Sequence, residues 1–131
     1  MKHKILRFRE AAFRQQAGRC YYCALPMFHS DVDNNIDRTA RPSLVYRLTC
    51  TAEHLVAASE GGRDSAKNIV AACRHCNHTR HRAKRPLPHN AYKEHVRRRM
   101  RAGRWHPIEV RVATRFVAPT EPPAQARISI A

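Results

Sequence analysis

The sequence has few acidic residues and no long hydrophobic run. Its 10 Asp and Glu stand against 25 Lys and Arg, which leaves a net charge of +15 with histidine neutral. Such a surplus on 131 residues favours a polyanionic partner. The longest uninterrupted apolar run, Cys20 to Leu25, is far shorter than a membrane span. A membrane protein is therefore a poor interpretation, and a nucleic-acid-binding protein is the favoured one.

A secretory segment is also lacking. The stretch from Met1 to Gln16 is interrupted by charged residues and has no apolar core of a signal peptide. We therefore expect a cytoplasmic protein, in which a reducing environment keeps cysteines out of disulfides. Apolar residues make up 43% of the chain, enough for the core of one domain. A chain of this length does not comfortably form two.

Four of the five cysteines form two C-x-x-C pairs, Cys20 with Cys23 and Cys73 with Cys76. Two such pairs complete a tetrahedral shell of four thiolates around zinc. A closed shell leaves no position for water, so we expect Zn²⁺ to be structural. There are two alternatives: a redox C-x-x-C, which lacks its βαβ setting here, and a finger-like site that uses His78 and His81.

The fifth cysteine, Cys50, lies in a segment with alternating apolar residues. Residues 43–51 place Leu44, Tyr46, Leu48 and Cys50 on one face, which predicts a strand. We expect Cys50 to be a buried free thiol that behaves as a small hydrophobic residue.

The remaining elements follow from periodicity and from the positions of Gly and Pro. Helices are predicted over 8–16, 74–84 and 90–101, a second strand over 108–116, and loops over 24–42 and around Gly61-Gly62. Residues 117–131 contain three prolines and are expected to form a flexible tail. The element count fits a small α+β domain.

Four polar residues lie between and beside the cysteine pairs, namely Glu53, His54, Asn68 and Asn77. They occur in the stretches Thr51-Ala-Glu-His-Leu-Val-Ala-Ala-Ser-Glu-Gly-Gly and Lys67-Asn-Ile-Val-Ala-Ala-Cys-Arg-His-Cys-Asn77. Together with Gly18-Arg-Cys20-Tyr-Tyr-Cys23, these motifs closely resemble the zinc-binding branch of the HNH nuclease family, also called ββα-metal or His-Me finger nucleases. The resemblance covers roughly residues 13–84 and is specific, because several spaced features coincide.

The resemblance implies a role for each of these residues. His54 would be the general base, and Glu53 with Asn77 would bind a catalytic Mg²⁺ or Mn²⁺. Asn68 would hold the loop or orient the histidine. The chemistry agrees, because histidine accepts a proton near neutral pH and oxygen ligands suit these ions.

The sequence departs from the family pattern at three positions. Glu53 stands where Asp is commoner, and Asn77 stands in place of His, with His78 beside it as a substitute ligand. Arg80 takes the place of the usual Lys and is expected to face phosphate. Six further histidines are expected to be surface or phosphate-facing groups: His29, His75, His81, His89, His95 and His106.

The segment from Arg74 to Arg115 holds 13 Lys and Arg but only Glu94 and Glu109 as acids. This imbalance predicts a phosphate-binding surface that docks double-stranded DNA with little sequence specificity. Trp105 is expected to be a core residue. The residues assigned to nucleic-acid contact are Arg80, Arg82, Lys84, Arg97, Arg98 and Arg101.

The sequence therefore predicts one α+β domain over 1–116, with a nuclease core at 13–84 and a basic extension at 85–116. The resemblance implies a central ββα finger in this core, held by the four-cysteine zinc site and flanked by basic helices. The expected activity is metal-dependent hydrolysis of DNA. The alternative is a zinc-ribbon protein that binds nucleic acid without catalysis. A nucleobase deaminase is excluded, because the sequence has neither the H-x-E nor the P-C-x-x-C motif of that class. The sequence does not decide whether the protein forms a homodimer, or whether it belongs to a phage or a restriction system.

Overall fold

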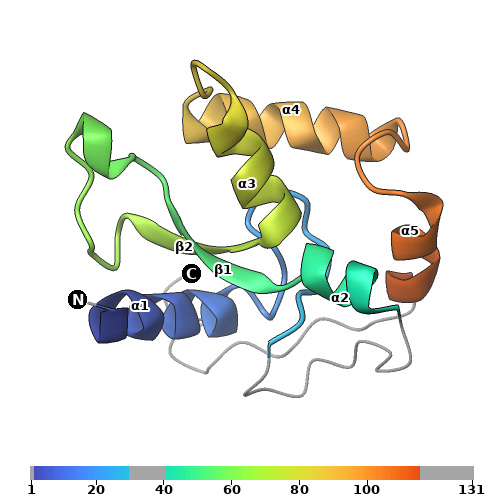
Figure 1. The fold of residues 1–131 in the computed structure, drawn as a ribbon, viewed down its shortest axis with the longest axis horizontal. Helices are drawn as coiled ribbons and strands as arrows, with labels where there is room; N and C mark the ends of the chain where they lie inside the picture. The colour runs from blue at the N-terminus through green and yellow to red at the C-terminus, as the bar shows by residue number, and fades with distance from the viewer. Residues whose placement is uncertain (1, 30–40, 116–131) are drawn as a thin grey trace, which may run out of the picture.

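A two-stranded antiparallel sheet lies at the centre of the fold in the computed structural model, which describes residues 2–29 and 41–115 (Figure 1). The described elements are α1 (Lys2–Gln15), α2 (Pro42–Arg47), β1 (Cys50–His54), the one-turn 3-10 helix η1 (Ala58–Glu60), β2 (Ile69–Cys73), α3 (Arg74–Arg82), α4 (His89–Arg101) and α5 (Ile108–Thr114). The predicted α+β class and the ββα order around the sheet are confirmed.

The register of the sheet sets the place of each motif. β1 and β2 pair from Cys50↔Cys73 at one end to His54↔Ile69 at the other. α1 lies on one side of the sheet, and α3 and α4 lie on the other (Figure 1). Because α3 follows β2 without a loop, it carries its polar residues back alongside β1.

The core forms where α1, the loop after it and the C-terminal helices meet. Phe13, Tyr22, Met27, Val96 and Val110 are each fully buried there. Cys50 is a buried free thiol, as predicted, and burial raises its pKa to about 12.

The three predicted helices are confirmed, with α1 beginning earlier than expected and α3 ending two residues sooner. On α4, Tyr92 and Val96 are buried and Met100 packs against the core, which is the stripe that the four-residue spacing predicts. None of the helices within the described residues is long and apolar enough to cross a membrane.

The strand predicted over residues 43–51 is wrong for most of its length. Residues 42–47 form α2, and β1 begins only at Cys50. Pro42 stands in the first turn of α2, where its fixed φ favours a helix and its missing N–H costs nothing. Alternation over so few residues does not distinguish a short helix from a strand.

The strand predicted over 108–116 is also wrong, because Ile108–Thr114 forms α5 after Pro107 at the N-cap. Val110 and Thr114, four residues apart, are buried, whereas Ile108 and Val112 are exposed. Helical spacing therefore decides which side chains reach the core. Phe116, residues 30–40 of the predicted loop and the predicted tail at 117–131 lie outside the described residues.

Candidate active site and metal centre

Four cysteines converge between the loop after α1 and the junction of β2 with α3. Their sulfur atoms all lie within 4.8 Å of one another, and all four residues are buried. Zinc–sulfur bonds of about 2.3 Å in a tetrahedron separate the sulfurs by about 3.8 Å. The 4.0 Å between the sulfurs of Cys23 and Cys73 fits that geometry.

The surroundings of the sulfurs suit thiolates bound to a cation. The backbone N–H of Cys73 donates to Cys20 Sγ at 3.3 Å, and Trp105 Nε1 donates to Cys76 Sγ at the same distance. Burial opposes ionisation of Cys20, but hydrogen bonds from the other three thiols hold its pKa well below the usual value. Hydrogen bonding to Cys20 raises the pKa of Cys23, and burial raises that of Cys76. A bound cation would stabilise four neighbouring thiolates, so this cluster of sulfur donors fits structural zinc.

The finger-like alternative is wrong, because neither of its histidines joins the sulfurs. His81 Nε2 lies 2.8 Å from Glu53 Oε1. His78 is exposed, and its Nε2 lies 3.4 Å from Arg74 Nη1. His78 is accordingly not placed to replace Asn77 beside Glu53.

Glu53 is a buried carboxylate near the end of β1, only 1% exposed. Its Oε2 accepts hydrogen bonds from the Tyr22 hydroxyl at 2.8 Å and from Arg80 Nη1 at 3.0 Å. Burial, reinforced by the charge of Glu53, raises the pKa of Tyr22, so Tyr22 stays a neutral donor. These contacts fix Oε2 and leave Oε1 facing His81.

Arg80 does not face phosphate, contrary to the prediction. It is 5% exposed. Besides Glu53, its guanidinium binds the carbonyl oxygens of Leu87, His54 and Leu55 through Nε, Nη1 and Nη2, at 3.0–3.1 Å. Arg80 is therefore a structural residue that holds the end of β1 against α3. Removing one partner of such a buried ion pair costs about 3–5 kcal/mol of stability.

Asn77 and His81 lie one helical turn apart on the face of α3 that meets β1. Asn77 Nδ2 donates to Thr51 Oγ1 at 3.0 Å and to the Ala52 carbonyl at 3.1 Å. Both amide hydrogens are thus used, and Oδ1 is left as an acceptor. His81 is exposed, as predicted, but its contact with Glu53 also makes it part of the site. The four-residue spacing from Asn77 was the signal that could have revealed it.

His54 ends β1 and is paired with a residue that the sequence did not single out. Its Nε2 lies 2.7 Å from Asp64 Oδ1, and the two side chains are 26% and 30% exposed. A carboxylate at this distance accepts the Nε2 hydrogen, which leaves Nδ1 of the neutral imidazole as the basic nitrogen. No local pattern identifies Asp64, because the pairing crosses the loop between the strands.

Asn68 holds that loop together. Its side chain accepts from the Val56 N–H at 2.9 Å and donates to the carbonyls of Val56 and Arg63 at 3.0 and 2.9 Å. Gly62 packs so closely that an added Cβ would lie 1.7 Å from the Val56 oxygen. The structure thus places Asn68 in the loop-holding role that the resemblance allowed.

Two histidines that were expected at the surface are buried. His29 Nε2 lies 2.6 Å from Glu10 Oε1, and His106 Nδ1 accepts from Arg47 Nε at 2.9 Å. Burial and the charge of Arg47 lower the pKa of His106 to about 3, so it stays neutral. Trp105 packs against the core, as predicted.

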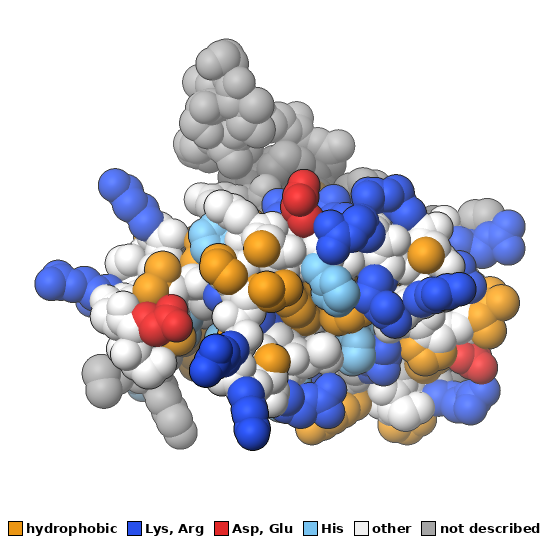
Figure 2. All heavy atoms as spheres, turned by 90° about the horizontal axis from the view of Figure 1, so that it is seen from above, with side chains coloured by type: hydrophobic (Ala, Val, Ile, Leu, Met, Phe, Trp, Pro, Cys, Tyr) orange, Lys and Arg blue, Asp and Glu red, His pale blue; other side chains and the backbone are white. Residues whose placement is uncertain are grey.

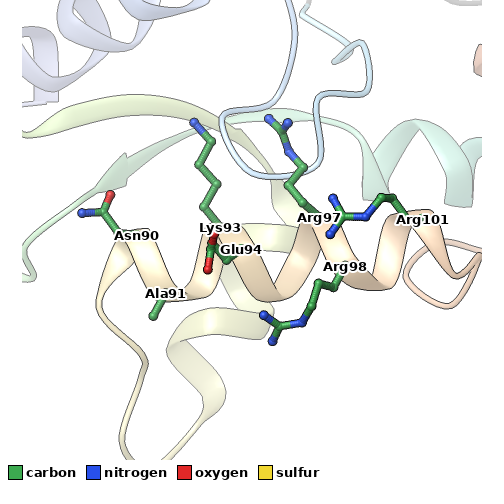
Figure 3. A pocket seen from close by; sticks show the side chains of 7 residues that line it. All are labelled: Asn90, Ala91, Lys93, Glu94, Arg97, Arg98 and Arg101. Atoms are coloured by element: carbon green, nitrogen blue, oxygen red, sulfur yellow. The ribbon is translucent and has the colours of Figure 1, made fainter.

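The basic surface centres on α4 and the end of α3. A hollow of about 720 Å³ borders α4, and in Figure 3 Lys93 and Arg97 point toward the loop of the first cysteine pair, whereas Arg98 points to the opposite side. Arg97 Nε donates to the Tyr22 carbonyl. Lys and Arg side chains far outnumber acidic ones on the face in Figure 2. The other predicted contacts are all exposed, namely Arg82, Lys84, Arg98 and Arg101.

No curated protein matches the chain. The family model described as HNH endonuclease matches residues 20–83, which contain both cysteine pairs, the two strands and α3. The matched segment therefore begins at the first cysteine of the cluster and covers the four cysteines and the polar residues around Glu53 and His54, whereas α4 lies outside it. The chain thus carries a domain of the HNH endonuclease family at residues 20–83, with four cysteines placed as in its zinc-binding branch.

Proposed function

We propose that this chain is a metal-dependent endonuclease that hydrolyses phosphodiester bonds in DNA, with His54 as the general base. The observation that carries the proposal is the pairing of His54 Nε2 with Asp64 Oδ1 at 2.7 Å, beside the buried Glu53. This pairing leaves a free lone pair on Nδ1 of a side chain that is 26% exposed. Such a nitrogen can take a proton from water as that water attacks phosphorus.

The donor set beside His54 fits the divalent ion that the family implies. Glu53 Oε1, Asn77 Oδ1 and His81 Nε2 would hold it, since carboxylate and amide oxygens suit Mg²⁺ or Mn²⁺ and an imidazole favours the softer ion. Such an ion, when bound, neutralises charge on the phosphate and on the leaving oxygen. Arg80 and Tyr22 keep Oε2 engaged and so fix the direction of Oε1.

The proposed domain extends beyond the family match to residues 1–116. On the N-terminal side, the Gln16 side chain donates to the Ala71 carbonyl at 2.8 Å and accepts from the Ala71 N–H at 3.0 Å, which joins the end of α1 to β2. On the C-terminal side, α4 supplies Arg98 and Arg101. These exposed cations, with Arg82, Lys84 and Arg97, would bind the DNA backbone and supply affinity without sequence selectivity.

A zinc-containing nucleic-acid-binding protein without catalysis is the second candidate. The observation that favours it is the Glu53–Arg80 ion pair, because a carboxylate already neutralised by arginine binds a metal less strongly. The two candidates differ in cleavage and agree in DNA binding, so cleavage is the discriminating measurement.

The test is conversion of supercoiled plasmid by the purified protein with Mg²⁺ or Mn²⁺. We expect nicked or linear product with either ion and none after dialysis into buffer free of divalent ions. Dialysis is preferred to a chelator because a chelator would also remove zinc, and zinc content is measured in every arm. DNA binding without conversion under any metal would contradict the endonuclease and support the second candidate.

Asp64→Asn is expected to lower kcat by about 10- to 100-fold with little change in KM, because an amide no longer selects the tautomer with hydrogen on Nε2. The measurement is steady-state cleavage together with ¹⁵N NMR of the His54 ring, which reports the tautomer directly. Glu60→Gln is the matched control, since Glu60 is an exposed acid on the same loop. An unchanged tautomer and kcat in Asp64→Asn would refute the positioning role.

A further inference from the structure

A groove rich in arginine lies between α2, α3 and Pro107. Its volume is about 370 Å³, and Figure 1 shows α2 against the start of α3. Tyr46 and Arg47 line it from α2, and Arg74, His78, Thr79 and Arg82 line it from α3. No acidic residue is found among the described residues that line it.

Tyr46 gives the groove an exposed aromatic surface. The residue is 61% exposed, and the guanidinium carbon of Arg74 lies 4.3 Å from its ring centroid. An arginine over the ring fixes its orientation and makes the stack attractive to an electron-rich planar group. Exposed aromatic rings beside cations are the platforms on which proteins stack unpaired bases.

The cations of the groove lack acidic partners. Arg74, His78 and Arg82 follow one another at four-residue intervals and form a row along α3. Arg82 Nη2 binds only the neutral Thr79 Oγ1, at 3.3 Å. Within 2–29 and 41–115, none of the groove's arginines pairs with a carboxylate. An anion would therefore find positive charge that no carboxylate neutralises here.

We propose that this groove binds one unpaired nucleotide of a nucleic-acid strand, with its base stacked on Tyr46 and its phosphate against Arg74 and Arg82. The volume lies at the low end of ligand pockets, about 300–1,000 Å³, and suits a single nucleotide. Bases inside a duplex offer no free face to a side chain, so the groove distinguishes unpaired from paired nucleotides.

The groove borders the candidate active site through α3. Asn77 precedes His78 by one residue, so the row that faces Glu53 is about 100° around the helix from the row that lines the groove. The inference rests on the proposed function in taking nucleic acid as the ligand, and it names the substrate class: DNA with an unpaired nucleotide next to the bond that is cut.

The test is binding of a fluorescent single-stranded oligonucleotide and of the matching duplex, measured by anisotropy in buffer free of divalent ions. Tyr46→Ala is expected to weaken single-strand binding by about 5- to 150-fold and to leave duplex binding unchanged. Tyr46→Phe keeps the ring and is expected to bind as the unaltered chain does. Ile108→Ala is the matched control, because Ile108 is equally exposed but lies outside the groove.

Cross-linking of an oligonucleotide that carries 5-iodouracil gives a second readout, with the attachment expected at Tyr46. Unchanged single-strand affinity in Tyr46→Ala, an equal loss with duplex, or a cross-link only at α4 would each overturn the inference. Because binding is measured without cleavage, the two proposals fail separately. Plasmid cleavage without a Tyr46 effect contradicts this inference alone, and a Tyr46 effect without cleavage contradicts the endonuclease alone.

Discussion

Replacing His54 with alanine is expected to lower the rate of phosphodiester cleavage by about 10²–10⁴-fold, which is the usual contribution of a positioned general base. The imidazole is the group placed to accept the proton from water, and Asp64 at 2.7 Å holds its other nitrogen. The measurement is the initial rate of plasmid nicking at saturating DNA with Mg²⁺ or Mn²⁺.

The fold of the His54→Ala variant should be intact. The side chain is 26% exposed and lies at the opposite end of β1 from Cys50, away from the sulfur cluster. Zinc content, melting temperature and DNA affinity should therefore match those of the unaltered chain. His3→Ala, an exposed histidine on α1, is the control for nonspecific effects of losing an imidazole. Cleavage by pure His54→Ala at a rate close to that of the unaltered chain would overturn the assignment.

Each half of the metal centre is predictable from sequence because short-range spacing fixes it, whereas the strand–strand–helix order follows from the family resemblance. A C-x-x-C pair brings two sulfurs together within one turn, so only the meeting of the two pairs depends on the fold. The loop that Asn68 holds is also predictable from sequence, since Gly62 and Asn68, which fix its shape, are only a few residues apart.

The two incorrect strands show where local patterns fail. In residues 43–51 and 108–116, apolar residues alternate, yet both segments follow a proline that suits the first turn of a helix. Val110 and Thr114 reach the core, whereas Ile108 and Val112 of the same alternating set remain in solvent. Which apolar residues are buried depends on the surfaces available to cover them, and the pattern alone does not contain that information.

The partners of the site residues were the least predictable. Arg80 and Glu53 are 27 residues apart, and nothing local distinguishes a buried ion pair from two surface charges. Asp64 reaches His54 across a loop whose path depends on Asn68. His81 is different, because its four-residue spacing from Asn77 places both on one helix face, and that spacing is visible in the sequence. Helical periodicity can thus find ligands on one element, whereas contacts between elements require the fold.

Replacing Cys76 with serine is expected to remove zinc and unfold the domain near room temperature. Cys76 is fully buried, and its sulfur also accepts the Trp105 Nε1 hydrogen bond at 3.3 Å. Zinc contributes about 10–16 kcal/mol to small zinc-dependent folds, whereas a whole domain is stable by only about 5–15 kcal/mol. The measurements are zinc per protein by atomic emission and thermal unfolding by circular dichroism.

Cys50→Ala separates the loss of a metal ligand from the loss of a buried thiol. Cys50 is buried nearby, but its sulfur is outside the four-sulfur cluster. This variant should keep its zinc and lose only about 1 kcal/mol, the typical cost of a small core change. Cys20→Ser should behave as Cys76→Ser does, because each removes one of four equivalent ligands. Full zinc content with an unchanged melting temperature in either serine variant would show that the sulfur cluster is not the metal centre. The two C-x-x-C pairs would then be held together by packing alone.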